Sequence, residues 1–136
     1  MRRRGQALVE LAVTLPLLLI LAFGAAQFVR LAIARAGLDA ATAAAVAAAA
    51  RAPNAKIAVT AGSAAFKGVA AGYRLDPSTA VTIVPGTFER GGKVTAQGTS
   101  AFDLGFSGVP ALGVRWRLVS AAAARIEDWR SRATQP

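Results

Sequence analysis

The feature that most constrains this chain is an apolar stretch near its amino terminus. Residues 11–29 contain no charged side chain, and the first half of the stretch is rich in leucine. As a helix with a rise of about 1.5 Å per residue, a run of about 20 apolar residues crosses the ~30 Å hydrocarbon core of a bilayer. The stretch is therefore either a membrane-spanning helix or the apolar part of an export signal.

One carboxylate, Glu10, lies where this apolar stretch begins. A carboxylate in a membrane helix costs roughly 2.5–3.5 kcal/mol at mid-bilayer and less near the interface, and intramembrane charges usually persist because they have a partner. Two interpretations of Glu10 therefore stay open. It is either hydrated among the lipid headgroups or paired with a group from another molecule.

The spacing between Gly5 and Glu10 carries a resemblance. Gly5 is followed by four residues, then by Glu10, and then by the long apolar run. This pattern resembles the amino-terminal signal of type IV pilins and pseudopilins. The resemblance implies that a prepilin peptidase cuts between Gly5 and Gln6. It also implies that Glu10, at the fifth position of the mature chain, pairs with the terminal amine of a neighbouring subunit.

More narrowly, residues 4–12 and the leucine run at 15–19 look like the TadE-like pseudopilins of tight-adherence (Flp) type IV pilus systems. The resemblance is strongest over residues 4–36, and a weaker resemblance to the same family lies at residues 118–127. Leu11 stands where the major Flp pilins usually carry tyrosine, which favours a minor, pseudopilin-type subunit. The resemblance implies a structural or assembly role in a pilus that serves adhesion and secretion. Its partners would be other pilin or pseudopilin subunits.

Basic residues set the expected orientation in the membrane. Arg2, Arg3 and Arg4 directly precede the apolar run, and the positive-inside rule holds such a cluster in the cytoplasm. Arg30 and Arg35, beyond the other end, weaken this contrast. We expect a single pass through the bacterial cytoplasmic membrane, with the carboxy-terminal domain outside the cytoplasm. After assembly, the subunit is expected at the cell surface, in the pilus.

The chain is expected to divide into a leader, a long helix and a second domain. Residues 1–5 form the basic leader, residues 6–52 the helix, and residues 53–136 an extracytoplasmic α+β domain. Pro53 ends the helix because proline cannot continue the hydrogen-bond ladder. The membrane span covers about residues 7–29.

Five residues are named as members of the expected membrane span. They are Leu11, Leu15, Pro16, Leu18 and Phe23. Proline inside a helix removes one backbone hydrogen bond and clashes with the preceding turn, so we expect a kink or a local opening at this proline. A helix that is apolar all round at this end suits lateral packing against copies of itself.

A second helix is expected after the proline at position 53. Asn54 is a suitable N-cap, and Gly72 is a candidate for the carboxy-terminal cap. Between these caps, apolar residues recur every four positions and form one stripe. The stripe consists of Ile57, Ala61, Ala65 and Val69, with Phe66 beside it. We expect this helix to lie against the more polar half of the first one.

From Thr79 the apolar period changes to two, which is typical of strands. A first strand is expected up to Pro85, and the proline marks it as an edge strand. It is expected to continue over residues 87–90 to a two-residue hairpin turn at Gly91–Gly92. A second strand is expected over residues 93–102.

The clearest alternation lies at residues 114–118, where Trp116 is expected to pack inward while Arg115 and Arg117 are solvated. Residues 120–132 either continue this strand or become helical. The expected fold is therefore α+β and pilin-like. It has a long transmembrane helix, a second helix and a small antiparallel sheet of three or four strands.

The arginines around Trp116 also allow a different interpretation. Basic residues with an aromatic between them can bind single-stranded nucleic acid by phosphate contact and base stacking. On a strand, however, the tryptophan faces opposite to both arginines, which favours the core interpretation. With a net charge of +9, the chain can still touch DNA or anionic lipid nonspecifically. We do not expect nucleic acid as a specific partner.

The composition argues against catalysis. The chain contains neither cysteine nor histidine, so it offers no disulfide, no thiolate metal ligand and not the commonest general base. Its few carboxylates do not have the spacing of an acid–base pair or a metal cage. We expect no enzymatic activity, no metal and no cofactor.

Two alternatives to the pseudopilin interpretation remain. The first is a secreted domain behind an ordinary signal peptide, cut before Gln27, because residues 24–26 are small. Against it, Glu10 lies at the start of the apolar region, and the helical pattern continues past the cut. The second is an uncleaved single-span anchor that serves as a scaffold in an envelope complex.

Overall fold

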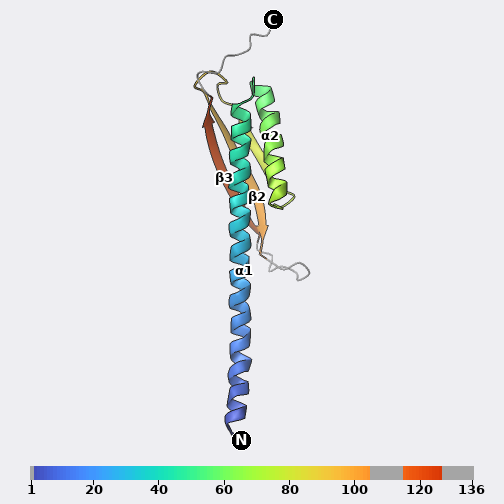
Figure 1. The fold of residues 1–136 in the computed structure, drawn as a ribbon, viewed down its shortest axis with the longest axis vertical. Coiled ribbons are helices and arrows are strands. Elements are labelled where there is room, and N and C mark those ends of the chain that lie inside the picture. The colour runs from blue at the N-terminus through green and yellow to red at the C-terminus, as the bar shows by residue number, and fades with distance from the viewer. Residues whose placement is uncertain (1, 105–114, 127–136) are drawn as a thin grey trace. The chain divides into compact units, whose positions relative to one another are not determined.

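The computed structural model of the chain describes residues 2–104 and 115–126. Within these residues, two helices precede three strands (Figure 1). The elements are α1 (Arg2–Ala50), α2 (Ala55–Gly72), β1 (Ala80–Val84), β2 (Lys93–Asp103) and β3 (Arg115–Arg125). The three strands form one antiparallel sheet in the order β1-β2-β3. The α+β class expected from the sequence is therefore confirmed, with three strands.

The chain forms two compact units, and the division falls after Ala32, inside α1. The first unit is the amino-terminal part of α1. Its backbone is helical from Arg2, and Pro16 lies inside the helix without interrupting it. The local opening expected at Pro16 is therefore not observed. Neighbouring residues of high helix propensity, leucine above all, offset the single hydrogen bond that proline removes.

The second unit contains the carboxy-terminal part of α1, which buries one stripe of mostly small residues. Its members recur at the spacing of one helix face, as expected for a helix that packs on a core. They are Leu38, Ala41, Thr42, Ala45, Val46 and Ala49. Because half of them are alanines, other backbones approach this face closely. The helix ends at Ala50, three residues before Pro53, close to the end expected from the sequence.

Helix α2 begins as the sequence indicates. The Asn54 side chain accepts a hydrogen bond from the Ile57 backbone N–H at 2.9 Å, which is the expected N-cap. Gly72 is the last helical residue, and the carboxy-terminal cap position is Tyr73 rather than Gly72. The cap is thus shifted by one residue from the expected position.

The buried stripe of α2 differs from the expected one. The buried residues are Ala58, Gly62 and Phe66, one position along from the expected stripe, and Ile57 is 45% exposed. The reason is a close approach at Gly62. A Cβ built on Gly62 would lie 2.8 Å from the Ala45 carbonyl oxygen and 3.3 Å from the Ala49 Cβ. Close packing against α1 therefore selects the face that carries this glycine, over the face with more apolar side chains.

Strand β2 is the centre of the sheet and buries alternate residues on one face. These are Val94, Ala96, Gly98, Ser100 and Phe102. Both helices contact this face at the middle of the strand, because side chains from α1 and α2 surround the position of a Cβ on Gly98. The opposite face of the sheet has no covering helix among the described residues (Figure 1).

The connection between β1 and β2 differs from the expected hairpin. Strand β1 ends at Val84, and residues 85–92 form a loop rather than a strand with a two-residue turn. Pro85 cannot donate to a ladder, which ends the pairing. Gly91 and Gly92 instead continue the pairing with the end of β3. The Gly91 N–H donates to the Ile126 carbonyl at 3.1 Å, and the Ile126 N–H donates to the Gly92 carbonyl at 2.8 Å.

Strand β3 runs to Arg125, so the ambiguous segment after Leu118 is strand up to that residue. The remaining part of that segment, residues 127–132, lies outside the described residues. Trp116 faces opposite to Arg117, as expected, but it is 50% exposed rather than buried. It is the second residue of an edge strand and has a cross-strand neighbour, Phe102, on one side only. Its expected burial is therefore wrong.

Candidate functional site

The first half of α1 exposes an unusually large apolar surface. Leu11, Leu15 and Leu18 are 59%, 51% and 55% exposed, whereas Pro16 is exposed and Phe23 is half-buried. Further exposed apolar side chains along it are Leu8, Val9, Val13, Leu17, Leu19, Ile20, Leu21, Phe28 and Val29. Contiguous exposed apolar surface on this scale marks a contact with lipid or with another protein.

This helix meets the length and composition required of a membrane span. The segment Gln6–Ala50 is one apolar helix, and its most apolar window has no buried residue. At about 1.5 Å per residue it is about 70 Å long, more than twice the ~30 Å hydrocarbon thickness. Only part of it can lie in a bilayer at one time. The part after Ala32 belongs to the second unit, so the first unit is the part available to a membrane.

The predicted processing site lies at the beginning of α1. The backbone is helical from Arg2, so the peptide bond between Gly5 and Gln6 lies within the first two turns. Glu10 follows Gln6 by about one turn, which is about 6 Å along the helix axis. The helix therefore holds these three residues close together.

Glu10 is exposed and has no hydrogen-bond or ion-pair partner in the part of the chain that the structure describes. On the helix surface its nearest neighbours toward the carboxy terminus are Val13 and Thr14, neither of which is basic. An unpaired carboxylate in an apolar surface is stable only with hydration or with a cation from another molecule. The structure therefore leaves the position beside Glu10 open to an external partner.

Gln27, near the other end of the apolar run, is a buried polar residue. Its burial was not predicted from the sequence. Its side chain is 4% exposed, and its Oε1 accepts a hydrogen bond from Arg30 Nη1 at 3.1 Å. Its Nε2 has no partner among the described residues. A glutamine within an otherwise apolar run was the only sequence signal for this feature.

A polar cluster on the second unit was also missed. Arg115 lies between two carboxylates, 3.3 Å from Asp76 and 3.1 Å from Asp103. The Ser78 hydroxyl and its backbone N–H, which donates at 2.8 Å, both donate to Asp76. These hydrogen bonds, followed by the charge of Arg115, hold the pKa of Asp76 below its usual range, although desolvation acts in the opposite direction. In the sequence, Asp76-Pro77-Ser78 indicates a turn, but nothing there indicates that Asp76 pairs with Arg115.

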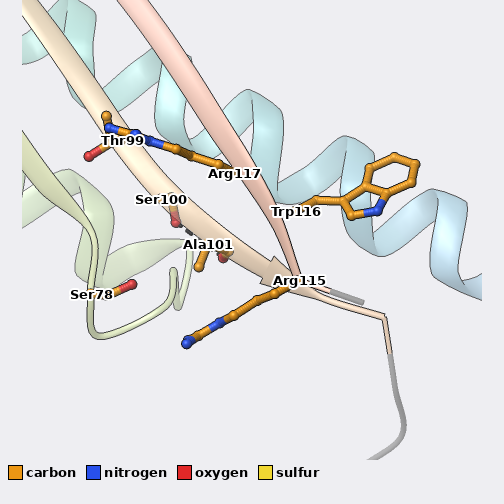
Figure 2. Close-up of a pocket in the computed structure, with 7 residues that line it drawn as sticks. All are labelled: Ser78, Thr99, Ser100, Ala101, Arg115, Trp116 and Arg117. Atoms are coloured by element: carbon orange, nitrogen blue, oxygen red, sulfur yellow. Dashed lines mark hydrogen bonds between the residues drawn. The ribbon is translucent and has the colours of Figure 1, made fainter. Parts of the chain in front are cut away.

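The same cluster borders an open hollow of about 290 Å³ (Figure 2). Its lining consists of Ser78, Thr99, Ser100, Ala101, Arg115, Trp116 and Arg117. In Figure 2 the Trp116 ring points away from both arginines. Asp76 and Asp103 both pair with Arg115, whereas Arg117 has no ion-pair partner among the described residues. The hydroxyls of Ser100 and Thr79 bond to each other at 2.7 Å.

In a comparison with known protein families, residues 5–51 match the TadE-like protein family. The matched segment begins at Gly5, contains Glu10 and ends one residue after α1. It thus includes the whole exposed apolar surface described above. No curated protein and no solved structure matches the chain.

Proposed function

We propose that this chain, which is TadE-like over residues 5–51, is a minor pilin or pseudopilin that acts as a structural or assembly subunit of a tight-adherence type IV pilus. The family match and the long apolar helix indicate a pilus-associated protein anchored in the membrane by a single span. The TadE-like family is a structural family, which supports a role without catalytic turnover. The proposed partners are a prepilin peptidase and other pilin or pseudopilin subunits.

The main support for this proposal is the location of Glu10 and its lack of a partner among the described residues. Glu10 lies one turn after the proposed cleavage site, in the exposed apolar surface of α1. Cleavage between Gly5 and Gln6 would create a terminal amine on Gln6. The same cut removes Arg2 to Arg4, so Glu10 becomes the only charged side chain before Arg30.

In the proposed mechanism, apolar helices pack side by side, and the charges set the offset of one helix along the axis of the next. The amine of one subunit meets the Glu10 carboxylate of its neighbour when the two helices are staggered by about one turn, which is about 6 Å along the axis. Apolar side chains by themselves do not define such a register, because neighbouring turns of the helix surface are chemically alike. Pairing of the two charges would also remove the cost of an unpaired carboxylate in an apolar environment.

The proposed location is the bacterial cytoplasmic membrane, with the second unit outside the cytoplasm, and the pilus or cell surface after assembly. The cluster Arg2–Arg4 supports this orientation through the positive-inside rule. A secreted domain cut before Gln27 has less support. Helix α1 is continuous across that position, and Gln27 itself is buried.

The intact mass and the amino-terminal sequence of the protein test the proposal. The protein is taken from membranes and from sheared surface filaments, in cells with and without an active prepilin peptidase. We expect a chain that begins at Gln6 only where the peptidase is active. A chain that begins at Gln27 would show an exported soluble domain instead. An uncut chain in the presence of the peptidase would show a permanent single-span anchor.

A further inference from the structure

Strand β3 forms one edge of the sheet and is unusually open for an edge strand. It is an eleven-residue strand without proline, whereas β1 at the opposite edge has five residues and is followed by Pro85. Edge strands of native proteins are usually short, interrupted or covered, because their free backbone groups pair with other chains. Strand β3 has none of these protections among the described residues.

The pairing pattern shows which backbone groups face the free edge. The Ile126 N–H donates to the Gly92 carbonyl, and in an antiparallel pair the bonded positions alternate along the strand. Residues of even number in β3 therefore bond to β2, and residues of odd number point their N–H and C=O groups outward. Between the two end residues of the strand, Arg115 and Arg125, the outward positions are Arg117, Val119, Ala121 and Ala123, and the structure gives their backbone groups no partner in another described element.

The side chains along this edge are small in the middle and basic at both ends. Val119, Ala121 and Ala123 are exposed and would not obstruct an added strand. Arg117 and Arg125 flank them on the same face, eight residues apart. Arg117 has no carboxylate partner among the described residues, and Arg125 donates only to the Gly91 carbonyl, at 3.2 Å. The edge therefore presents two uncompensated positive charges.

This charge pattern disfavours a second copy of the chain as the strand that pairs with the edge of β3. If two β3 strands paired antiparallel about Ala121, Arg117 of each would lie opposite Arg125 of the other. Directly opposed like charges destabilise a strand pair. A strand with carboxylates at the matching positions would instead be stabilised at both ends.

We propose that the free edge of β3 binds an extended, acidic segment of another protein chain by strand addition. The backbone groups at the four outward positions supply the hydrogen bonds, and Arg117 and Arg125 select carboxylates eight residues apart in the added strand. This inference goes beyond the pilus role and depends neither on cleavage at Gly5 nor on Glu10. Its failure would therefore leave the proposed function untouched.

The test uses the full chain in nonionic detergent micelles and a synthetic nine-residue peptide. Valine and threonine alternate in the peptide between two terminal glutamates, so that its carboxylates have the spacing of the two arginines. A second peptide carries lysine in place of both glutamates. Binding is measured by fluorescence anisotropy at low salt, about 50 mM, where exposed charges are weakly screened. Amide exchange is read residue by residue by NMR with and without the peptide.

We expect the glutamate peptide to bind roughly tenfold more tightly than the lysine peptide, a difference typical of charge selection. The amides of Arg117, Val119, Ala121 and Ala123 should exchange rapidly in the free chain and slowly in the complex. The double variant Arg117→Glu/Arg125→Glu should reverse the preference between the peptides. The matched control Lys56→Glu/Lys67→Glu changes two exposed charges on α2 by the same amount and should keep the original preference.

A backbone variant separates strand addition from simple charge attraction. Ala121→Pro removes an outward N–H that is not part of the β2–β3 ladder, so the fold should persist while binding of the glutamate peptide is lost. Retained binding in Ala121→Pro, or an unchanged preference in the double arginine variant, would overturn the proposal. So would slow exchange at the four outward amides in the free chain, or a stable dimer that Ala121→Pro dissociates.

Discussion

Thr42 of α1 lies directly over Gly98 in the middle of β2, and any side chain at Gly98 would meet the Thr42 hydroxyl. Thr42 is fully buried, and its hydroxyl donates to the Leu38 carbonyl at 2.8 Å. A Cβ on Gly98 would also lie 3.1 Å from Leu38 Cδ1 and 3.2 Å from Phe66 Cε2. Gly98 is therefore a point where side chains of both helices meet the sheet in the second unit.

The first prediction concerns this contact. Gly98→Ala should lower the free energy of unfolding of the second unit by roughly 1–3 kcal/mol, because a methyl group overpacks the site. The measurement is thermal unfolding of the full chain in detergent, followed by circular dichroism. Gly68→Ala is the matched control, since nothing lies within 4 Å of its added methyl. That control should be neutral or stabilising by up to ~1 kcal/mol, because alanine favours a helix. Equal destabilisation by both variants would contradict the contact.

The second prediction compares two aromatic residues. Phe66 is 2% exposed and Trp116 is 50% exposed. Phe66→Ala should cost roughly 3–5 kcal/mol of unfolding free energy, the usual cost of a large cavity in a core. Trp116→Ala should cost clearly less, because half of the ring already contacts solvent. The same unfolding measurement ranks the two variants, and a larger loss for Trp116→Ala would show that the tryptophan is buried.

The third prediction concerns Glu10. Glu10→Ala and Glu10→Gln should leave insertion into the membrane intact, because removal of a charge from an apolar helix favours insertion. Incorporation into sheared filaments should fall by roughly tenfold or more, since a register-setting ion pair is lost. Immunoblots of membrane and filament fractions measure both quantities. Thr14→Val, one turn further along the helix, is the control and should assemble normally. Wild-type incorporation of Glu10→Ala would exclude the proposed charge pairing.

The fourth prediction concerns processing at Gly5. Gly5→Val should prevent cleavage, so that the protein keeps residues 1–5 and stays in the membrane fraction. Gly24→Val is the control, because this glycine lies in the same helix, far from the proposed site, in open surroundings. Intact-mass spectrometry distinguishes the two forms. Removal of residues 1–5 from Gly5→Val at the wild-type rate would contradict processing at this bond.

The fifth prediction concerns the dependence of stability on pH. The pKa of Asp76 is lowered in the folded chain, chiefly by hydrogen bonds from Ser78 and then by Arg115. A carboxyl with a lowered folded-state pKa contributes stability above its unfolded pKa, and this contribution is lost as the pH falls through the folded pKa. Asp76→Asn should therefore be less stable than the wild type near neutral pH.

The difference between these two proteins should shrink below the unfolded aspartate pKa of about 3.9 and disappear below the lower folded-state pKa of Asp76. Unfolding temperatures measured from about pH 7 to about pH 2 test this. Ser78→Ala should flatten the same acid dependence, since it removes the hydroxyl that contributes most to the shift. A stability difference that stays constant down to the lowest pH would show that Asp76 acts through packing rather than through its charge.

Much of the local structure could be predicted because it depends on neighbours in the chain. The Asn54 cap, the end of α1 before Pro53 and the strand over residues 93–102 all follow from residues a few positions apart. The candidate site could also be predicted, since the glycine, the glutamate and the apolar run lie within one short segment. The family match over residues 5–51 rests on the same segment.

The errors share a different origin. The predicted stripe of α2 follows the apolar side chains and leaves out Gly62, which is a point of close approach to Ala45. The glycines at 91 and 92 suggested a tight turn, whereas they extend the pairing with the end of β3. The alternation along residues 114–118 predicts that Trp116 packs inward, opposite to the two arginines, whereas it is 50% exposed. Each outcome depends on a contact between residues far apart in the chain.

The sequence by itself thus determined that this chain carries a membrane-length apolar helix with a lone carboxylate at its start, and an α+β region after it. Those properties follow from length, charge and periodicity, which act over short distances along the chain. Only the tertiary structure decided which face of α2 is buried, how Asp76 and Asp103 share Arg115, and that β3 lies at an edge of the sheet that the described residues form. Such features depend on which segments meet in space, because packing between distant residues outweighs the small local preferences of each residue.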